Sequence, residues 1–276
     1  MSIYLPIIDA VDAIFEMNDV PTEGFEVAGQ SLDVLRLPGA THEAPTLVML
    51  HEGLGSIALW RDLPWRLRER TGCSVLAYSR HGNGFSSVLE APRDARYLHD
   101  EALTVLPALL DRAGVECPLL LGHSDGASIA LIFAGAYPQR AMGLVLLAPH
   151  VFVEDCSLRS IAEIGERFRA GPLRERMARH HRDVDRTFFG WNDIWLDASF
   201  RDWNIETYLP SVTAPVIMVQ GRNDEYGTMA QLDAIQRGLR ARADRIELDG
   251  CGHAPQRDRP EAVESVIVAF AQAAWK

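Results

Sequence analysis

One ten-residue stretch, 119–128, constrains the fold of this 276-residue chain more than any other. It reads Leu-Leu-Leu-Gly-His-Ser-Asp-Gly-Ala-Ser, an apolar run that ends in Gly-x-Ser-x-Gly and continues into a helical pattern. A strand, a sharp turn and a helix in this order expose a serine at the carboxyl end of the strand. We therefore predict that Ser124 is a nucleophile and that Gly122 and Gly126 stand where a side chain would clash. For the motif taken alone, an ordinary glycine-rich turn with a capping serine is the alternative.

Apolar runs bounded by turn residues recur along the chain, with amphipathic stretches such as 100–113 and 124–137 between them. These runs are residues 46–50, 74–78, 118–121, 143–147 and 215–220. Near-continuous apolar strands that alternate with helices are typical of a parallel sheet covered on both faces. Residues 25–27 and 31–37 alternate in polarity instead, which predicts an antiparallel hairpin ahead of them. The expected fold class is α/β.

This alternation of strands and helices stops between residues 150 and 210. No buried-strand run occurs there, while Arg, His, Asp and aromatic residues accumulate in helical patterns. We expect this segment to be a helical cap, or lid, over the carboxyl edge of the sheet, where open α/β sheets bind their ligands. The predicted organisation is a core domain of residues 1–149 and 211–276, with residues 150–210 inserted as the cap.

Composition excludes several classes of partner. The net charge is −11, with 27 Lys and Arg against 38 Asp and Glu, which argues against nucleic acid or an anionic membrane. Residues 1–12 lack the pattern of a signal peptide, and no apolar stretch is long enough to span a bilayer. The four cysteines have no paired spacing, so neither zinc nor a disulfide framework is indicated. We expect a cytoplasmic monomer or homodimer with a small-molecule substrate and no cofactor or metal.

A serine hydroxyl needs a base, usually a histidine that a carboxylate orients. Asp224 follows the apolar run 216–219 within Gly-Arg-Asn-Asp, and His253 ends Gly-Cys-Gly-His after residues 245–248. We predict that His253 is the base and that Asp224 orients it. The neighbouring Glu225 remains open as the alternative acid.

An oxyanion hole needs backbone N–H groups, which favours a glycine-rich loop after an early strand. Residues 51–56, His-Glu-Gly-Leu-Gly-Ser, follow the strand predicted at 46–50. We expect the N–H groups of Gly53 and Asp125 to be the two donors. Glu52 places a carboxylate at the same edge of the sheet, and its role is left open.

Together these motifs resemble those of α/β-hydrolase-fold enzymes with a helical cap, over essentially the whole chain. The resemblance rests on residues 51–55, 79–86 and 119–128, on the Asp224 turn, and on the Gly-x-Gly-His stretch before Arg259-Pro260-Glu261. It implies Ser124 as nucleophile, His253 as base and Asp224 as its orienting acid. Two positions depart from the family pattern. Glu52 replaces the usual glycine of the oxyanion loop, and Ser79 stands where the family has Asp.

The predicted cap offers candidate pocket walls. Trp191 and Trp195 are four residues apart and would share one face of a helix, although aromatic residues at this spacing more often serve packing. With Glu52 they are the candidates for the substrate pocket. Residues 180–183, His-His-Arg-Asp, are expected to be a solvated or interdomain polar cluster.

By resemblance to capped carboxylesterases and enol-lactonases, the expected activity is hydrolysis of a small carboxylic ester or lactone. Cleavage of a carbon–carbon bond in a ring-fission product is an alternative, disfavoured because Ala254-Pro255 follow His253 where such hydrolases often have Trp. Cofactor-free haloperoxidase-like or aminopeptidase activity stays open. Haloalkane dehalogenase and epoxide hydrolase activities are disfavoured, because both need a carboxylate nucleophile and position 124 is a serine. A ligand receptor on the same fold, or a scaffold that only binds a partner, would be the non-enzymatic alternatives.

Overall fold

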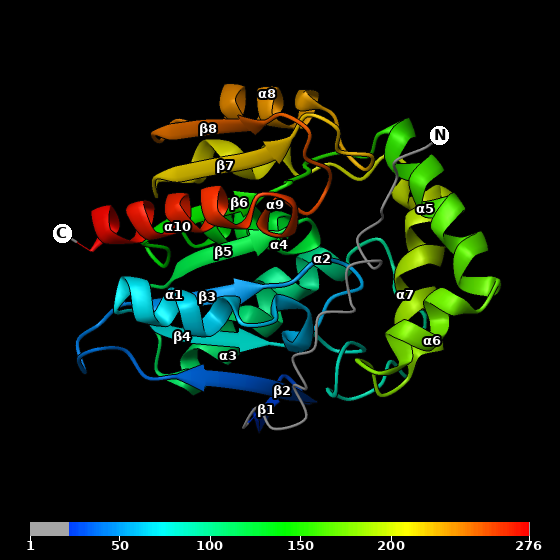
Figure 1. The fold of residues 1–276 in the computed structure, drawn as a ribbon, viewed down its shortest axis with the longest axis horizontal. Coiled ribbons are helices and arrows are strands. Elements are labelled where there is room, and N and C mark those ends of the chain that lie inside the picture. Colours follow the sequence, from blue (N-terminus) through cyan, green and yellow to red (C-terminus); the bar gives the residue numbers. More distant parts are fainter. Residues whose placement is uncertain (1–21, 276) are drawn as a thin grey trace.

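An eight-stranded sheet, in the order β1-β2-β4-β3-β5-β6-β7-β8, forms the centre of the computed structural model, which describes residues 22–275 (Figure 1). The strands are β1 (Thr22–Val27), β2 (Gln30–Leu37), β3 (Thr46–Leu50), β4 (Ser74–Tyr78), β5 (Leu119–His123), β6 (Gly143–Leu147), β7 (Val216–Gly221) and β8 (Ala243–Leu248). The strands from β3 to β8 pair in parallel, while β1 and β2 form the predicted antiparallel hairpin. The predicted α/β fold class is confirmed. The prediction for residues 1–12 lies outside the described residues.

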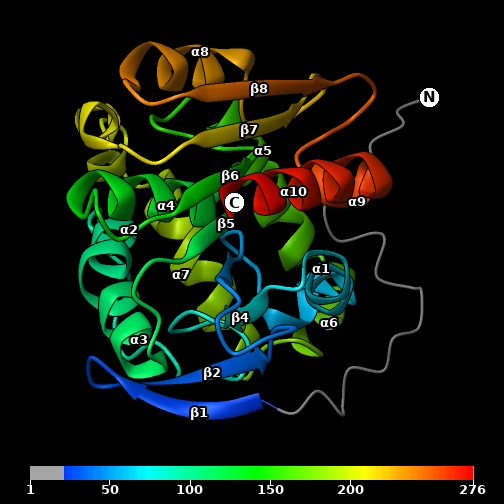
Figure 2. The same ribbon diagram turned by 90° about the vertical axis from the view of Figure 1, so that its left-hand side faces the viewer.

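Helices cover both faces of the sheet, as predicted for apolar parallel strands. One face carries α1 (Leu63–Thr71) and α10 (Pro260–Ala274), and the other carries α3 (Leu106–Ala113), α4 (Asp125–Ala136) and α8 (Met229–Gly238) (Figure 2). Successive side chains of a strand point to opposite faces. In β5, Leu120 accordingly packs in one apolar cluster, while Leu119 and Leu121 pack in the other.

The helix predicted at 100–113 is longer and less regular than expected. It begins with α2 (Tyr97–Asp100), passes through one π-helical turn at Glu101–Val105, and continues as α3. The side chain of Glu101 in the π turn accepts a hydrogen bond from the hydroxyl of Tyr78 at 2.6 Å. The π turn therefore coincides with a buried polar contact to the sheet, which an apolar periodicity cannot predict.

The chain between β6 and β7 leaves the sheet and forms α5 (Asp155–Arg169), α6 (Pro172–Ala178) and α7 (Val184–Leu196) beyond the carboxyl ends of the parallel strands (Figure 1). Short turns follow at Ala198–Phe200 and Glu206–Ser211, and the remaining short helices are Ile57–Trp60 and α9 (Pro255–Asp258). The two ends of this segment pair with each other. Phe152 and Asn204 form an antiparallel bridge, and the Ile205 N–H donates to the Val151 carbonyl at 2.8 Å.

The polar residues at 180–183 join this helical segment to the core. Nδ1 of His181 accepts the N–H of Gly84 at 2.9 Å, and the N–H of Arg182 donates to the Gly84 carbonyl at 2.7 Å. Asp183 is the N-cap residue of α7, and its side chain accepts the N–H of Arg186 at 3.0 Å. His181 is buried in this contact whereas Arg182 is exposed to solvent, so the residues combine the two environments that were expected.

Candidate active site

Ser124 lies in a sharp turn between β5 and α4 with φ 55° and ψ −117°. Such a conformation is unusual for a non-glycine residue and depends on the packing around it. A Cβ atom on Gly122 would lie 2.4 Å from the carbonyl oxygen of Gly126. One on Gly126 would lie 2.0 Å from the carbonyl oxygen of Leu50. The predicted crowding at both glycines is confirmed, because only residues without a side chain let α4 start this close to the sheet.

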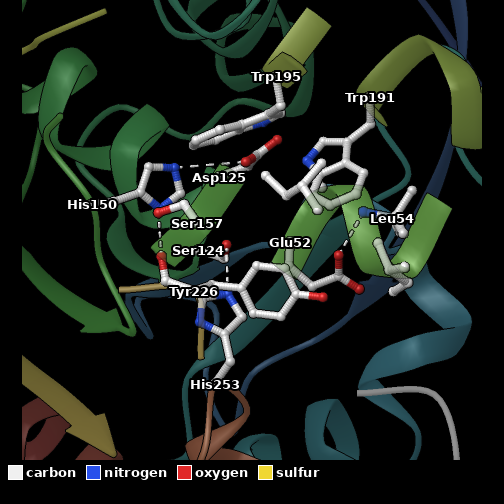
Figure 3. Close-up of a pocket in the computed structure, with 13 residues that line it drawn as sticks. Glu52, Leu54, Ser124, Asp125, His150, Ser157, Trp191, Trp195, Tyr226 and His253 are labelled. Carbon is white, nitrogen blue, oxygen red and sulfur yellow. Dashed lines mark hydrogen bonds and ion pairs between the residues drawn. The ribbon is translucent and has the colours of Figure 1, made fainter. Parts of the chain in front are cut away.

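A hydrogen-bonded chain connects three predicted site residues. Oγ of Ser124 lies 2.9 Å from Nε2 of His253 (Figure 3). Nδ1 of His253 lies 2.8 and 2.9 Å from the two carboxylate oxygens of Asp224. The three residues follow different strands, β5, β7 and β8, at one edge of the sheet. With its Nδ1 proton directed at Asp224, the imidazole presents the lone pair of Nε2 to the serine hydroxyl.

The Asp224 carboxylate is held in place by its own turn. Its Oδ1 accepts the N–H groups of Tyr226 at 2.8 Å and Gly227 at 3.2 Å, and its Oδ2 accepts from Nε2 of Gln220 at 3.2 Å. Of the two neighbouring acids, Asp224 is the one that contacts the imidazole. Burial lowers the pKa of His253, but the Asp224 charge and hydrogen bond raise it more, so the pKa lies above its ordinary value.

A second histidine, His123, contacts the backbone of His253. Nε2 of His123 lies 2.7 Å from the carbonyl oxygen of His253, and Nε2 of Gln256 lies 3.1 Å from Nδ1 of His123. Burial holds the pKa of His123 well below its ordinary value, so the ring is neutral. His123 thus positions the backbone of His253 and stays away from the serine hydroxyl.

The loop at residues 51–56, which is predicted to supply an oxyanion donor, is hydrogen-bonded to the neighbouring loop at residues 79–86. Nε2 of His51 accepts the N–H of Arg80 at 3.0 Å, and Nδ1 of His51 donates to the Glu52 carbonyl at 2.6 Å. The guanidinium of Arg80 donates to the carbonyls of His51 at 2.6 Å and Glu52 at 3.0 Å. The side-chain amide of Asn83 donates to the carbonyls of Gly53 at 3.1 Å and Gly55 at 3.0 Å. Burial keeps the pKa of His51 well below its ordinary value, which suits a structural, neutral imidazole.

Both predicted oxyanion donors, Gly53 and Asp125, line the space in front of Ser124. A Cβ on Gly53 would lie 2.1 Å from Nε1 of Trp191, so only glycine fits beneath that indole. Asp125 is the first residue of α4, where backbone N–H groups have no partner inside the helix. Their action as oxyanion donors remains a prediction.

The Asp125 side chain proves to be part of a buried network that sequence reasoning missed. Its Oδ2 accepts the hydroxyl proton of Tyr97 at 2.8 Å, and that hydroxyl accepts Nε1–H of Trp195 at 2.9 Å. The carboxylate also lies 3.6 Å from Nη2 of Arg80 and 3.7 Å from Nε2 of His150. Nothing in the sequence singled out Tyr97, since it stands in a helix without a motif.

The pocket in front of Ser124 has walls from the core and from the 150–210 segment (Figure 3). The free space in front of Ser124, counted out to the mouth and including open solvent, is about 480 Å³. The predicted Trp191 and Trp195 both line it, as does Glu52. The described residues that line it are Glu52, Gly53, Leu54, Ser124, Asp125, His150, Ser157, Ile161, Ile164, Trp191, Trp195, Tyr226 and His253. This set contains no lysine or arginine, and burial lowers the pKa of His150 to about 4.

Within residues 22–275, no helix is long and apolar enough to cross a bilayer. No group of three His, Cys, Asp or Glu side chains there is arranged to hold a metal ion.

Comparison with known proteins identifies the family. Residues 47–266 match the sequence model of the alpha/beta hydrolase family. The chain belongs to this family. It is 32% identical over 106 residues to the human (Homo sapiens) (lyso)-N-acylphosphatidylethanolamine lipase, covering 38% of this chain and 30% of the lipase. It is 29% identical over 156 residues to proline iminopeptidase of Lactobacillus helveticus (strain DPC 4571), covering 55% and 51%. The chain thus spans about half or less of these relatives' length.

Among solved structures, 2-hydroxy-6-oxo-6-phenylhexa-2,4-dienoate hydrolase from Rhodococcus sp. strain RHA1 superposes with a TM-score of 0.76 at 18% identity. The match covers 91% of this chain and 98% of that one. A thermophilic esterase from Thermogutta terrifontis gives a TM-score of 0.71 at 17% identity, covering 92% and 99%. These likenesses establish the alpha/beta hydrolase fold of the chain.

Proposed function

We propose that this alpha/beta hydrolase cleaves a small carboxylic ester or lactone by acyl transfer through Ser124. One observation carries the proposal: the hydrogen-bonded chain from Oγ of Ser124 through His253 to Asp224, at the edge of the sheet and facing a pocket. A base, an orienting acid and a nucleophile in this relation are what acyl transfer to serine requires.

In the proposed reaction, Oγ of Ser124 attacks the carbonyl carbon while Nε2 of His253 takes the hydroxyl proton. The N–H groups of Gly53 and Asp125 donate to the oxyanion of the tetrahedral intermediate. His253 then gives its proton to the leaving oxygen as the C–O bond breaks, which leaves an acyl enzyme. A water molecule, deprotonated by His253, attacks that ester and releases the acid and the free serine. Asp224 stabilises the imidazolium in both halves of the reaction.

The pocket supports a small, largely apolar substrate. Its walls include Ile161, Ile164, Trp191 and Trp195, and none of the described residues that line it is a lysine or arginine that could bind a substrate carboxylate. The lipase among the relatives and the esterase among the structural neighbours also support ester chemistry. The proline iminopeptidase relative supports amide cleavage as the second candidate, since the same serine mechanism serves both bonds.

Removal of the serine hydroxyl tests the proposal. We expect Ser124→Ala to lower kcat for p-nitrophenyl acetate by roughly 10⁴-fold or more and to abolish covalent labelling by a fluorophosphonate. Ser265→Ala, which removes an exposed serine of α10, is the matched control and should label and turn over like the wild type. A Ser124→Ala protein with an unchanged rate would overturn the proposal. Labelling of the wild type without sustained turnover would favour a receptor on the same fold.

Comparison of matched substrates then separates the bond classes. The wild type is expected to hydrolyse short p-nitrophenyl esters and small lactones in preference to alanine or proline p-nitroanilide. A preference for the anilides would move the proposal to aminopeptidase activity, with Ser124 in the same role.

A further inference from the structure

Glu52 is the pocket residue that the acyl-transfer mechanism does not use. The residue stands in the oxyanion loop between His51 and Gly53, and its side chain lines the pocket (Figure 3). The loop contributes to the chemistry through the N–H of Gly53, so a side chain at position 52 is not needed for that step. A buried carboxylate kept beside a reactive serine therefore calls for another explanation.

The two oxygens of Glu52 have different surroundings. Oε2 accepts the N–H of Leu54 at 2.5 Å, which anchors the side chain. Oε1 is buried, and it has no hydrogen-bond partner among the described residues. The residue as a whole is only 9% exposed, so solvent does not replace that partner. A buried polar atom without a partner destabilises the free protein, and a bound molecule that offers a hydrogen bond removes this penalty.

The charges around Glu52 indicate what that molecule would offer. Burial raises the pKa of Glu52, whereas the positive charge of Arg257 and the hydrogen bond from Leu54 oppose the shift by stabilising the carboxylate. Arg257 belongs to a second, smaller cavity on the other side of Glu52, and no described cation lines the pocket itself. In its ionised form, which the charge of Arg257 and the Leu54 N–H favour, the Glu52 carboxylate only accepts hydrogen bonds, so its partner must be a donor.

The other residues around Glu52 further limit which donor groups could bind there. Figure 3 shows the hydroxyl end of Tyr226 directed toward Glu52, while Trp191 and Leu54 lie on the same side of the pocket. A carboxylate beside aromatic faces suits a hydroxyl or an ammonium group on an otherwise apolar chain. A substrate carboxylate would be repelled at this position.

We propose that Glu52 selects substrates that carry a hydroxyl or ammonium group near the scissile carbonyl, and that its Oε1 accepts the hydrogen bond. This inference rests on the proposed ester hydrolysis and names the class of substrate for it. Glu52 acts here as a specificity-determining residue, in contact with the substrate and separate from the proton transfers of Ser124 and His253.

Three esters of nearly the same size and shape test whether Glu52 selects a hydrogen-bond donor on the substrate. Methyl butanoate, methyl 3-hydroxypropanoate and protonated methyl 3-aminopropanoate differ only in a terminal CH₃, OH or NH₃⁺. Each kcat/KM is measured by base uptake at constant pH and divided by the rate of hydrolysis of the same ester by hydroxide. Propyl acetate and 2-hydroxyethyl acetate form a second set, which places the donor on the alcohol side of the scissile bond.

In at least one set, we expect the wild type to prefer a donor-bearing ester by about 10- to 100-fold, the range for a hydrogen bond to a charged group. Glu52→Leu should bring the ratios close to one. Glu52→Gln keeps an oxygen for the Leu54 N–H or the substrate hydroxyl, so it should retain part of the hydroxyl preference and lose any ammonium preference. Glu225→Gln is the matched control: this carboxylate acts on His253 through its charge and accepts a hydrogen bond from the His253 backbone, but it does not line the pocket, so the ratios between esters should persist even if the overall rate changes.

The inference is overturned if the ratios of the Glu52→Leu protein equal those of the wild type in both sets. If Glu52→Leu also slows all the esters by the same factor, Glu52 only holds the loop. Failure of the proposed function looks different, because the wild type would then hydrolyse none of the esters and would not react with a fluorophosphonate. Hydrolysis of all five esters without preference would overturn the Glu52 inference alone.

Discussion

The carboxyl edge of the sheet and the helices α5 and α7 form opposite walls of one pocket, but they are stabilised in different ways. At the sheet edge, backbone groups hold the reacting side chains: the Ser124 N–H donates to the Leu147 carbonyl at 2.9 Å, and two N–H groups hold Asp224. Between the helices, side chains pack on side chains. Phe168 stacks on Phe188 with ring centroids 3.8 Å apart.

This difference separates two kinds of tolerance to substitution. A group held by backbone hydrogen bonds depends less on which side chains surround it, so a change of a reacting residue at the sheet edge acts mainly on whether the reaction occurs. A wall made of side chains takes the shape of the residues that fill it, so a change in α5 or α7 acts on which substrate fits. The predictions below test this separation, with the largest expected effect first.

The largest effect is expected at the sheet edge, from Asp224→Asn. Loss of the charge that steadies the imidazolium should lower kcat/KM by roughly 10⁴-fold, as such changes do in other serine hydrolases. The wild-type rate should fall as the pH drops through the pKa of His253, which lies above its ordinary value, because only neutral imidazole acts as a base. In the variant this limb should move to lower pH, since the charge that raised the pKa is gone. A profile of kcat/KM against pH measures both effects, and an unshifted limb would contradict the assignment.

A smaller effect on selectivity is expected in the helical wall, from Ile164→Ala. Shortening this pocket-lining residue of α5 should raise the ratio of kcat/KM for p-nitrophenyl butanoate over acetate by about tenfold, the usual worth of a methylene group in a pocket. Ile267→Ala creates a comparable cavity in α10, on the other face of the sheet, and is the matched control. Both variants should lose about 2–5 kcal/mol of unfolding free energy. If the control changes the ratio equally, the distinction between edge and wall fails.

The smallest effect is expected where the two regions meet, from Tyr97→Phe. Its hydroxyl links Asp125, beside the nucleophile, to Trp195 of α7. Without it two buried polar groups lose a partner, which should cost about 1–3 kcal/mol of unfolding free energy in urea titrations. We expect Trp195→Phe to cost less once Tyr97→Phe is present than it does alone, because both remove the same hydrogen bond. Strict additivity of the two changes would mean that the link carries no energy.

The sheet and its reacting edge could be predicted because each follows from local signals. Ser124 stands between two glycines after an apolar run, and Asp224 and His253 each follow a strand within a glycine-containing turn. Parallel strands bring their carboxyl ends to one edge, so three distant residues become neighbours without any knowledge of side-chain packing. The structure brings them within hydrogen-bonding distance.

The rest of the pocket depends on contacts that no local pattern encodes. Ile161 and Ile164 occupy the apolar face of α5 and resemble ordinary core residues in sequence. Tyr97 gains its partners only when the helix that begins there packs against α4 and α7. The unpaired oxygen of Glu52 follows from a single N–H at Leu54, which the sequence cannot reveal.

The bridge between Phe152 and Asn204 affects how the sequence of this protein can diverge in evolution. The bridge brings the two ends of the helical segment together beside the sheet, so the chain between them leaves and returns at nearly the same point. The cost of closing such a loop grows only slowly with its length. We therefore expect changes in the length of residues 153–203 to disturb the sheet little, although the contacts of His181 with Gly84 and of Trp195 with Tyr97 would have to be replaced. Exchange of residues 153–203 would replace one wall of the pocket and so change the range of substrates.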